Sequence, residues 1–255
     1  MRYQGSKAKL SKKINELVMT AYREGMLYIE PFAGGCNSFS RVPISRKLAC
    51  DSNRYIIALW NGIKDGTFEI PEYVTKEMYD DVRESYRNED GRYSDAMIGY
   101  VSVCCSYGGG FWNGYAHYNP KKHENHIEEA KNGLLRQISG FYGLQDSIFL
   151  CSSYESLTEP FTEECFVYCD PPYADTKKYK DDFDSEMFWN WCRDVVSVGK
   201  SIVMVSEYNA PSDFVCIYEK GMQDGMSYGN GTKTEKIFVH ETQAYLFGLL
   251  FGMTA

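Results

Sequence analysis

The feature that most constrains this chain is an apolar run, Cys165–Cys169, that ends abruptly in Asp170-Pro-Pro-Tyr173. Proline lacks a backbone N–H and fixes φ, so two prolines in a row end a strand. We therefore expect a buried strand whose end presents the Asp170 carboxylate and the Pro171 carbonyl as rigid hydrogen-bond acceptors. Acceptors without neighbouring donors suit an amino group, and the Tyr173 ring can stack on a flat heterocycle. The alternative is a structural Pro-Pro turn after a buried strand.

Other apolar runs of strand length alternate with segments of helical spacing. Further strands are predicted at Met26–Ile29, Lys47–Cys50, Ser201–Val205, Phe214–Tyr218 and Glu235–His240. Helices are predicted at Leu10–Ala21, Asn53–Ile63, Tyr79–Arg87 and Ser185–Val198, with one more starting near Asn37. This alternation predicts an α/β fold with a mainly parallel sheet and an antiparallel final hairpin.

The amino-acid composition of the chain changes between residues 66 and 150. Acidic helical segments there give way to a stretch, Ile98 to His123, that contains no acid and in which aromatic residues interleave with glycines. We interpret 66–150 as an inserted, largely helical lobe, and residues 1–65 and 151–255 as the catalytic domain that carries it. The aromatic and basic stretch suits contact with a nucleic acid. The alternative is a loop whose aromatic side chains form a small core of their own.

A glycine turn and an acid follow the first two predicted strands. The turn, Glu30-Pro-Phe-Ala-Gly-Gly35, lets the backbone approach a ligand closely, and the helix expected after it offers free N–H groups. Asp51 ends the second strand, where doubly wound folds bind ribose hydroxyls. Together they predict an adenosyl cofactor. The alternatives are a tight structural turn and an aspartate that caps the helix near Asn53.

Composition limits the class of protein. With 44% hydrophobic and 24% charged residues the chain is predicted to fold, and its apolar run at 244–251 is too short to span a bilayer. The nine cysteines are odd in number and contain no Cys-x-x-Cys, and no export signal is apparent. We expect reduced thiols, no metal and a cytoplasmic monomer.

Charge is distributed unevenly along the chain. The net charge of −8 argues mildly against a polyanionic partner. Residues 1–23 nevertheless carry six basic residues and one acid. This end of the chain can face phosphate, or it can be a solvated basic helix face.

These motifs, in this order, resemble those of the Dam-type DNA adenine N6-methyltransferases, which use S-adenosylmethionine. The resemblance covers most of the chain through Tyr3-x-Gly5-x-Lys7, Glu30-Pro-Phe-x-Gly34, Asp51, Asn113-Gly-x-x-x-Tyr-Asn119, Ser153-Tyr154 and Asp170-Pro-Pro-Tyr173. It implies a Rossmann-like methyltransferase sheet, S-adenosylmethionine as the cofactor and double-stranded DNA as the partner. The inserted lobe, 66–150, then becomes the target-recognition domain.

The resemblance also implies roles for individual residues. The residues expected to hold the cofactor are Tyr3, Lys7, Glu30, Pro31, Phe32, Gly34, Asp51, Tyr154 and Asp170. The catalytic residues that hold the target adenine are Asp170, Pro171, Pro172 and Tyr173. Together with the aromatic stretch and the basic N-terminal segment described above, it gives the residues expected to contact DNA: Lys9, Tyr107, Trp112, Asn113, His117, Asn119, Lys121 and Lys122.

Two residues depart from the family pattern. Cys36 stands where the family commonly has the last glycine of Pro-Phe-x-Gly-x-Gly, so we expect a narrower methionine end of the cofactor pocket or a shifted loop. His117 stands where the family has the arginine of Asn-Gly-x-x-Arg-Tyr-Asn. Arginine contacts guanine bidentately in the major groove and histidine cannot, so a GATC target is not carried over to this chain.

The expected reaction is direct methyl transfer to the N6 amino group of an adenine flipped out of the duplex. The motif Asp170-Pro-Pro-Tyr173 alone leaves other amines open: cytosine N4 in DNA, a base in RNA, or a protein glutamine. A catalytically idle regulator that binds cofactor and DNA is a further alternative, for which Cys36 would be a sign of decay.

Overall fold

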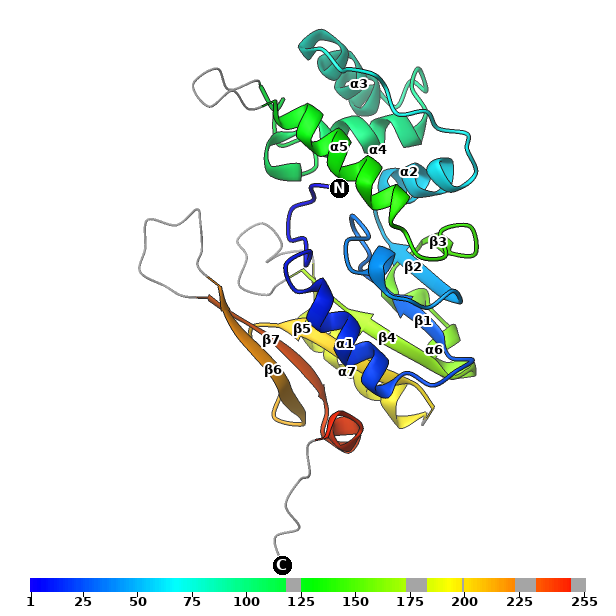
Figure 1. Cartoon of the computed structure of the whole chain (residues 1–255), viewed down its shortest axis with the longest axis vertical. Coiled ribbons are helices and arrows are strands. Elements are labelled where there is room, and N and C mark those ends of the chain that lie inside the picture. The colour runs from blue at the N-terminus through cyan, green and yellow to red at the C-terminus, as the bar shows by residue number, and fades with distance from the viewer. Residues whose placement is uncertain (118–124, 173–182, 199, 223–232, 249–255) are drawn as a thin grey trace, which may run out of the picture. The chain divides into compact units, whose positions relative to one another are not determined.

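The computed structural model describes residues 1–117, 125–172, 183–198, 200–222 and 233–248 (Figure 1). The chain forms two compact units. The first unit comprises Met1–Asn15 and Ala33–Ser153, and the second comprises Glu16–Phe32 and Tyr154–Ala255. Helix α1 (Ser11–Ala21) begins in the first unit and ends in the second.

Five strands of the second unit form a sheet in the order β1-β4-β5-β7-β6 (Figure 1). Their bounds are β1 (Leu27–Glu30), β4 (Cys165–Cys169), β5 (Ile202–Glu207), β6 (Phe214–Met222) and β7 (Lys233–His240). β1, β4 and β5 are parallel, and β7 is antiparallel to both β5 and β6. All residues of β1, β4 and β5 are buried, which is typical of parallel strands covered on both faces.

Two α-helices pack on this sheet. The short helix α6 (Glu159–Thr162) contacts β4, and α7 (Ser185–Ser197) contacts β5. α7 begins after Asp184, whose carboxylate accepts a hydrogen bond from the Met187 N–H at 2.9 Å. Such a cap satisfies one of the free N–H groups of the first turn. The 3₁₀ segments of this unit are η3 (Tyr154–Ser156) and η4 (Glu241–Phe247).

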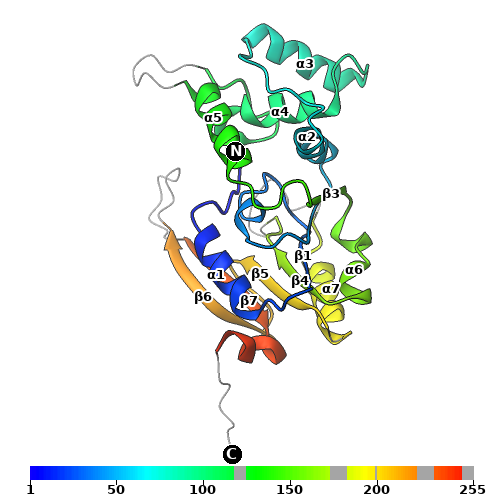
Figure 2. The same ribbon diagram turned by 45° about the vertical axis from the view of Figure 1, so that its right-hand side comes forward.

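The first unit contains a parallel strand pair and a group of helices. β2 (Lys47–Asp51) pairs with β3 (Ile148–Cys151), so that Asp51 lies opposite Cys151. The helices are α2 (Arg54–Lys64), α3 (Lys76–Asn88), α4 (Asp95–Cys104) and α5 (His126–Ser139), with 3₁₀ segments η1 (Phe39–Arg41) and η2 (Tyr107–Gly109). α4 contacts the other three helices, and Figure 2 shows it in the middle of the group.

Close packing of α4 on α2 depends on Gly99. A Cβ at this position would lie 2.2 Å from the carbonyl oxygen of Tyr55, so only glycine lets the two backbones approach this closely. The α4 segment from Ile98 to Cys104 is buried on every side. A helix of this kind has no polar face and hence no amphipathic period in its sequence.

The predicted α/β class, the mainly parallel strand pairing and the antiparallel final hairpin are confirmed. The predicted strands and the helices at Leu10–Ala21, Asn53–Ile63, Tyr79–Arg87 and Ser185–Val198 also form, with ends that differ by a few residues. Strand β3 and helices α4 and α5 were not predicted individually. The assignment of 66–150 to a target-recognition lobe stays a proposal.

The helix predicted to start near Asn37 was wrong. Only the three-residue segment η1 forms there, and Val42 has an extended backbone with φ −67° and ψ 123°. The reason is Pro43, which disfavours helical geometry in the residue before it and cannot donate a helical hydrogen bond. The glycine turn is therefore not followed by an α-helix N-terminus.

Within the described ranges, none of the helices combines the length and the apolar character needed to cross a bilayer.

Candidate functional site

The first part of the site is the turn Ala33–Cys36, which we call the glycine loop. It is fixed to the end of β2 by two backbone donors. The Ala33 N–H donates to the Cys50 carbonyl at 2.9 Å, and the Gly34 N–H donates to Oδ2 of Asp51 at 2.8 Å. Gly34 has φ +46°, a conformation that glycine adopts without strain. The loop and the acid that the sequence singled out are thus in direct contact.

Asp51 is half-buried and holds two backbone N–H groups. Its Oδ1 accepts from Asn53 at 2.8 Å, while Oδ2 accepts from Gly34. Helix α2 is capped by Asn53 instead, which accepts from the Tyr55 N–H at 3.1 Å, so the alternative role of Asp51 as the cap of α2 falls to its neighbour. Burial raises the pKa of Asp51, and the two N–H bonds act in the opposite direction. A carboxylate has about four acceptor positions, so capacity for further donors remains.

Tyr3 lies directly against the glycine loop. A Cβ at Gly34 would be 2.7 Å from Cε1 of Tyr3, and a Cβ at Gly35 would be 2.7 Å from its Cβ. Any side chain at either position would displace the tyrosine. The structure therefore brings together Tyr3, Gly34 and Asp51, three of the residues predicted to bind cofactor.

Cys36, which replaces a glycine of the family pattern, has a left-handed backbone conformation. Its φ is +52°, in the left-handed region, and its side chain is fully buried. This conformation strains an L-residue by about 1–2 kcal/mol. Glycine, the residue of the family pattern at this position, would adopt this conformation without strain.

Gln137 on α5 also holds the glycine loop, and the sequence analysis missed it. Its Nε2 donates to the carbonyl oxygens of Gly35 and Cys36, both at 2.9 Å, and lies 3.3 Å from Oγ of Ser40. A single glutamine in a helical segment gives no sequence signal for such a role.

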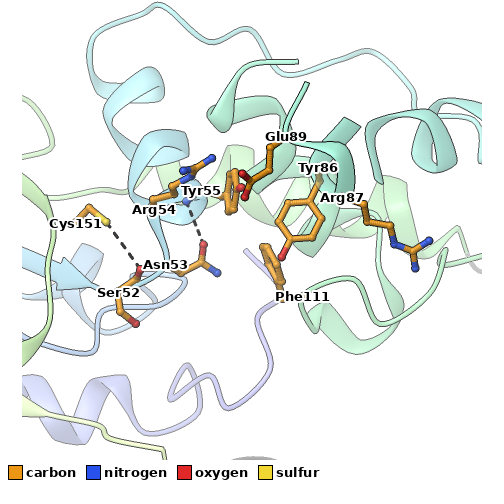
Figure 3. A pocket seen from close by; sticks show the side chains of 9 residues that line it. All are labelled: Ser52, Asn53, Arg54, Tyr55, Tyr86, Arg87, Glu89, Phe111 and Cys151. Carbon is orange, nitrogen blue, oxygen red and sulfur yellow. Dashed lines mark hydrogen bonds between the residues drawn. The ribbon is translucent and has the colours of Figure 1, made fainter. Parts of the chain in front are cut away.

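A pocket of about 670 Å³ opens just beyond β2 and β3 (Figure 3). It is lined by Ser52, Asn53, Arg54, Tyr55, Tyr86, Arg87, Glu89, Phe111 and Cys151. Tyr55 stacks on Phe111 with ring centroids 6.0 Å apart, and Tyr86 meets Phe111 edge-on at 5.6 Å. Figure 3 shows these rings across the pocket from Ser52. A pocket lined by both aromatic rings and polar side chains suits a planar heterocycle with polar edges.

The second unit carries the other predicted residues at the carboxyl ends of β1 and β4. Glu30 ends β1, is only 3% exposed, and accepts a hydrogen bond from the Tyr28 hydroxyl at 2.7 Å. Asp170 follows β4 and is half-buried, with Pro171 buried and Pro172 half-buried. Because β1 and β4 are parallel neighbours, Glu30 and Asp170 lie at the same edge of the sheet. Tyr173 lies outside the described residues.

Tyr168, two residues before Asp170, has a buried side chain on β4. The Tyr168 hydroxyl and Oγ of Ser206 are 2.8 Å apart, joining β4 to β5. Burial raises the pKa of Tyr168 well above its usual value, and the negative charge of Asp170 adds to the effect. Tyr168 therefore stays protonated as a hydrogen-bonding group at the end of β4.

Phe32 and Tyr154 form part of an aromatic cluster in the second unit. Their ring centroids are 5.4 Å apart, and Phe188 lies 5.6 Å from both. Trp191 meets Tyr154 edge-on at 5.4 Å. Pro31, which precedes Phe32, is also buried. Phe32 and Tyr154, two of the three aromatic residues predicted to bind cofactor, are thus both in contact with α7.

The described residues that were predicted to contact DNA differ in exposure. Tyr107, Asn113, His117 and Lys9 are exposed, and Asn113 donates to the Tyr107 carbonyl at 3.1 Å. Trp112 instead packs on Tyr79 and Tyr86, with ring centroids 5.3 and 5.5 Å away. A local core therefore forms around Trp112, as the alternative interpretation of this stretch expected. Asn119, Lys121 and Lys122 lie outside the described residues.

Lys7, which is predicted to bind cofactor, is buried, with only 6% of its surface exposed. Among the residues that the structure describes, no group of three or more His, Cys, Asp or Glu side chains is arranged to hold a metal ion.

Comparison with known proteins decides the family. The family model of the D12 class N6 adenine-specific DNA methyltransferases matches residues 3–191. The chain belongs to this family. The region of this D12-class chain that the family model matches contains the glycine loop, Asp51, Gln137 and Asp170.

Curated relatives of this D12-class chain include DNA adenine methylases. The protein from Escherichia coli K12 is 27% identical over 164 residues, which is 59% of this chain and 57% of that protein. The protein from Vibrio cholerae O395 is 29% identical over 159 residues, 57% of this chain and 56% of that protein. The aligned regions thus span a little over half the length of these relatives.

Among solved structures, the rRNA methyltransferase aviRa from Streptomyces viridochromogenes aligns with 97% of this chain and 90% of its own, at 10% identity. Its TM-score is 0.44, a similarity too low to support an argument.

Proposed function

We propose that this chain transfers a methyl group from S-adenosylmethionine to the N6 amino group of an adenine in duplex DNA. The observation that carries the proposal is the end of β4, where Asp170 and Pro171 follow a fully buried strand in a D12-class chain. The names of the relatives, DNA adenine methylase, support the same substrate.

The acceptors at the end of β4 suit this chemistry. An adenine amino nitrogen is a poor nucleophile because its lone pair is delocalised into the ring. The Asp170 carboxylate and the Pro171 carbonyl accept its two N–H bonds, which favours a pyramidal nitrogen with a localised lone pair. Pro171 and Pro172 contribute no competing N–H donor. Tyr173 is proposed to stack on the base.

Positioning supplies much of the rate acceleration. Holding the nitrogen in line with the methyl group accounts for roughly 7–11 kcal/mol of the barrier, without a covalent enzyme intermediate. The amine need not lose a proton first, because the N–H becomes acidic only once the new N–C bond has formed. The Asp170 carboxylate or solvent then accepts that proton.

The residues proposed to hold S-adenosylmethionine fit its chemical groups. When bound, it supplies an electrophilic methyl group. Asp51 retains acceptor capacity for ribose hydroxyls, and the glycine loop exposes backbone beside Tyr3. The pocket that begins at Ser52, the residue after Asp51, is proposed to take the adenine ring of the cofactor. The other residues proposed to contact the cofactor are Lys7, Glu30, Pro31, Phe32, Tyr154 and Asp170.

DNA contact is proposed for the exposed residues of the aromatic stretch. Tyr107, Asn113, His117 and Lys9 are accessible, whereas Trp112 packs on Tyr79 and Tyr86. Asn119, Lys121 and Lys122 are proposed as further contacts. A base in a duplex must be flipped out to be methylated, which costs a few kcal/mol of unstacking. We propose that the protein acts in the cytoplasm and as a monomer.

The substrate is tested with methyl-labelled S-adenosylmethionine and a panel of unmethylated duplex DNA, RNA and protein. We expect label in duplex DNA, recovered as N6-methyladenine after digestion to nucleosides. Label found only in cytosine, in RNA or in protein would show that the proposed substrate is wrong and would identify the actual one. Binding of cofactor and DNA without any transfer would favour the regulator. Sequencing the methylated DNA gives the target site, for which GATC is not assumed.

A further inference from the structure

Three segments of the first unit meet at residues 2–4. The first is this N-terminal segment itself, the second is the glycine loop, and the third is Ser106–His117, which we call the recognition loop. The Gln4 N–H donates to the Gly109 carbonyl at 3.1 Å. A Cβ at Gly109 would lie 2.7 Å from the backbone C and O atoms of Arg2, so the recognition loop and the N-terminal segment are in backbone contact.

The other side of the same segment faces the glycine loop. The ring of Tyr3 leaves no room for a side chain at Gly34 or Gly35, while the backbone N of Tyr3 lies 2.8 Å from where a Cβ on Gly109 would be. Tyr3 therefore touches both loops. A shift of one loop is therefore expected to move residues 2–4, which are hydrogen-bonded to the recognition loop through Gln4 and packed on the glycine loop through the Tyr3 ring.

Helix α5 forms a second connection between the loops. Near its start, the His126 ring meets the Tyr107 ring at 6.0 Å, and Glu129 pairs with Arg2 at 3.2 Å. Near its end, Gln137 donates to the carbonyls of the glycine loop. Eight residues separate Glu129 from Gln137, about 12 Å along a helix. The helix is thus a rigid rod that is attached to both loops.

We propose that Tyr3 and Gln137 are positioning residues that couple the glycine loop to the recognition loop, so that cofactor and DNA bind cooperatively. The inference rests on the proposed function, because it assigns cofactor to one loop and DNA to the other. Each ligand orders the loop that it contacts. Through Tyr3 and Gln137 it orders the other loop as well, and the second ligand then binds with less loss of conformational entropy.

The coupling is measured as a ratio of two dissociation constants. Sinefungin, an unreactive analogue of S-adenosylmethionine, is titrated into the full chain by calorimetry with and without sheared duplex DNA that lacks N6-methyladenine. For the wild type we expect DNA to tighten sinefungin binding by about five-fold or more, the range of ordinary allosteric coupling. Linkage requires sinefungin to tighten DNA binding by the same factor.

Two variants test the connections, each with a matched control. Gln137→Met keeps the side-chain length and removes both donors, and its control is Gln145→Met, since Gln145 also donates to one backbone carbonyl, that of Lys64, at 3.1 Å. Gly109→Ala places a Cβ against Arg2. Its control is Gly108→Ala, which has a similar positive φ, +65° against +72°, but meets nothing within 4 Å.

We expect Gln137→Met and Gly109→Ala to reduce the ratio to nearly one, while both controls keep the wild-type ratio. An unchanged ratio in Gln137→Met, or an equal loss in the controls, would overturn the inference. If Gln137→Met does not fold, as judged by thermal unfolding, Gln137→Glu serves instead, because an ionised carboxylate cannot donate. A wild type that binds both ligands with a ratio of one contradicts the coupling alone, whereas a wild type that binds no sinefungin contradicts the proposed function.

Discussion

The backbone N–H of Gly34 donates a hydrogen bond to Oδ2 of Asp51 at 2.8 Å. The acid at the end of β2 therefore anchors the glycine loop in addition to any contact with a ribose. Its other oxygen holds the Asn53 N–H, which orients the start of α2. Loss of this carboxylate should consequently affect stability and cofactor binding together.

Asp51→Ala should lower the free energy of unfolding by about 1.5–3 kcal/mol, because two N–H groups lose a charged acceptor. The same variant should raise KM for S-adenosylmethionine more than it lowers kcat. Asp51→Asn keeps one carbonyl acceptor and should show smaller effects on both. Urea unfolding and steady-state kinetics of the two variants check this, and a wild-type KM in Asp51→Ala would remove the residue from the cofactor site.

Replacement of Cys36 should reverse the usual order of alanine and glycine. In the middle of a helix or strand, glycine destabilises a protein by about 0.5–1 kcal/mol relative to alanine. At φ +52° the alanine variant keeps the left-handed strain, whereas the glycine variant relieves about 1–2 kcal/mol. Cys36→Gly should therefore be at least as stable as Cys36→Ala in urea unfolding. A clearly more stable alanine variant would show that the backbone of this loop is not held in the left-handed region.

The cysteines should differ sharply in reactivity. Cys151 is exposed, while Cys104 is buried and burial raises its pKa to about 12. Thiolate is the reactive form, so a thiol-specific reagent at neutral pH should modify Cys151 first and Cys104 only on unfolding. Cys216, of intermediate exposure, should react more slowly than Cys151. Loss of the fast phase in Cys151→Ser checks the assignment, and a persistent fast phase would contradict it.

Stability should fall in acid partly through Asp90. The Ser85 hydroxyl, followed by the Arg92 N–H groups, lowers the pKa of Asp90 from 3.8 to about 2. A carboxyl whose pKa is lower in the folded state stabilises the fold above its unfolded pKa, and this contribution is lost as the pH falls from about 4 to 2. The difference in unfolding free energy between wild type and Asp90→Asn should shrink over this range. A constant difference would mean that the ionised form contributes nothing.

Much of the site was predictable because its chemistry lies at strand ends. Asp51 ends strand β2 in the first unit, and Asp170 follows strand β4 in the second unit; both come at the end of an apolar run. The glycine loop is likewise recognisable from its two consecutive glycines, Gly34 and Gly35. These features depend on residues close together in the chain, which is why sequence patterns reveal them.

The contacts that hold the site were not predictable from the sequence. Gln137 reaches the glycine loop from about one hundred residues away in the chain, and no local pattern marks such a pair. Trp112 was expected at the DNA surface, yet it packs on Tyr79 and Tyr86, because an aromatic residue in a glycine-rich stretch can face either way. The helix expected near Asn37 fails because Pro43 ends regular structure there.

The central claim concerns the acceptor pair at the end of β4, and mass spectrometry of DNA nucleosides tests it most directly. Unmethylated duplex DNA is incubated with S-adenosylmethionine and either the wild type or Asp170→Asn, and cooperative thermal unfolding is used to confirm that each protein is folded. The wild type should form N6-methyladenine, and Asp170→Asn should form it at least about 100-fold more slowly, because the neutral amide is a weaker acceptor for the amine and cannot take up its proton. Equal rates for the two proteins would contradict the account.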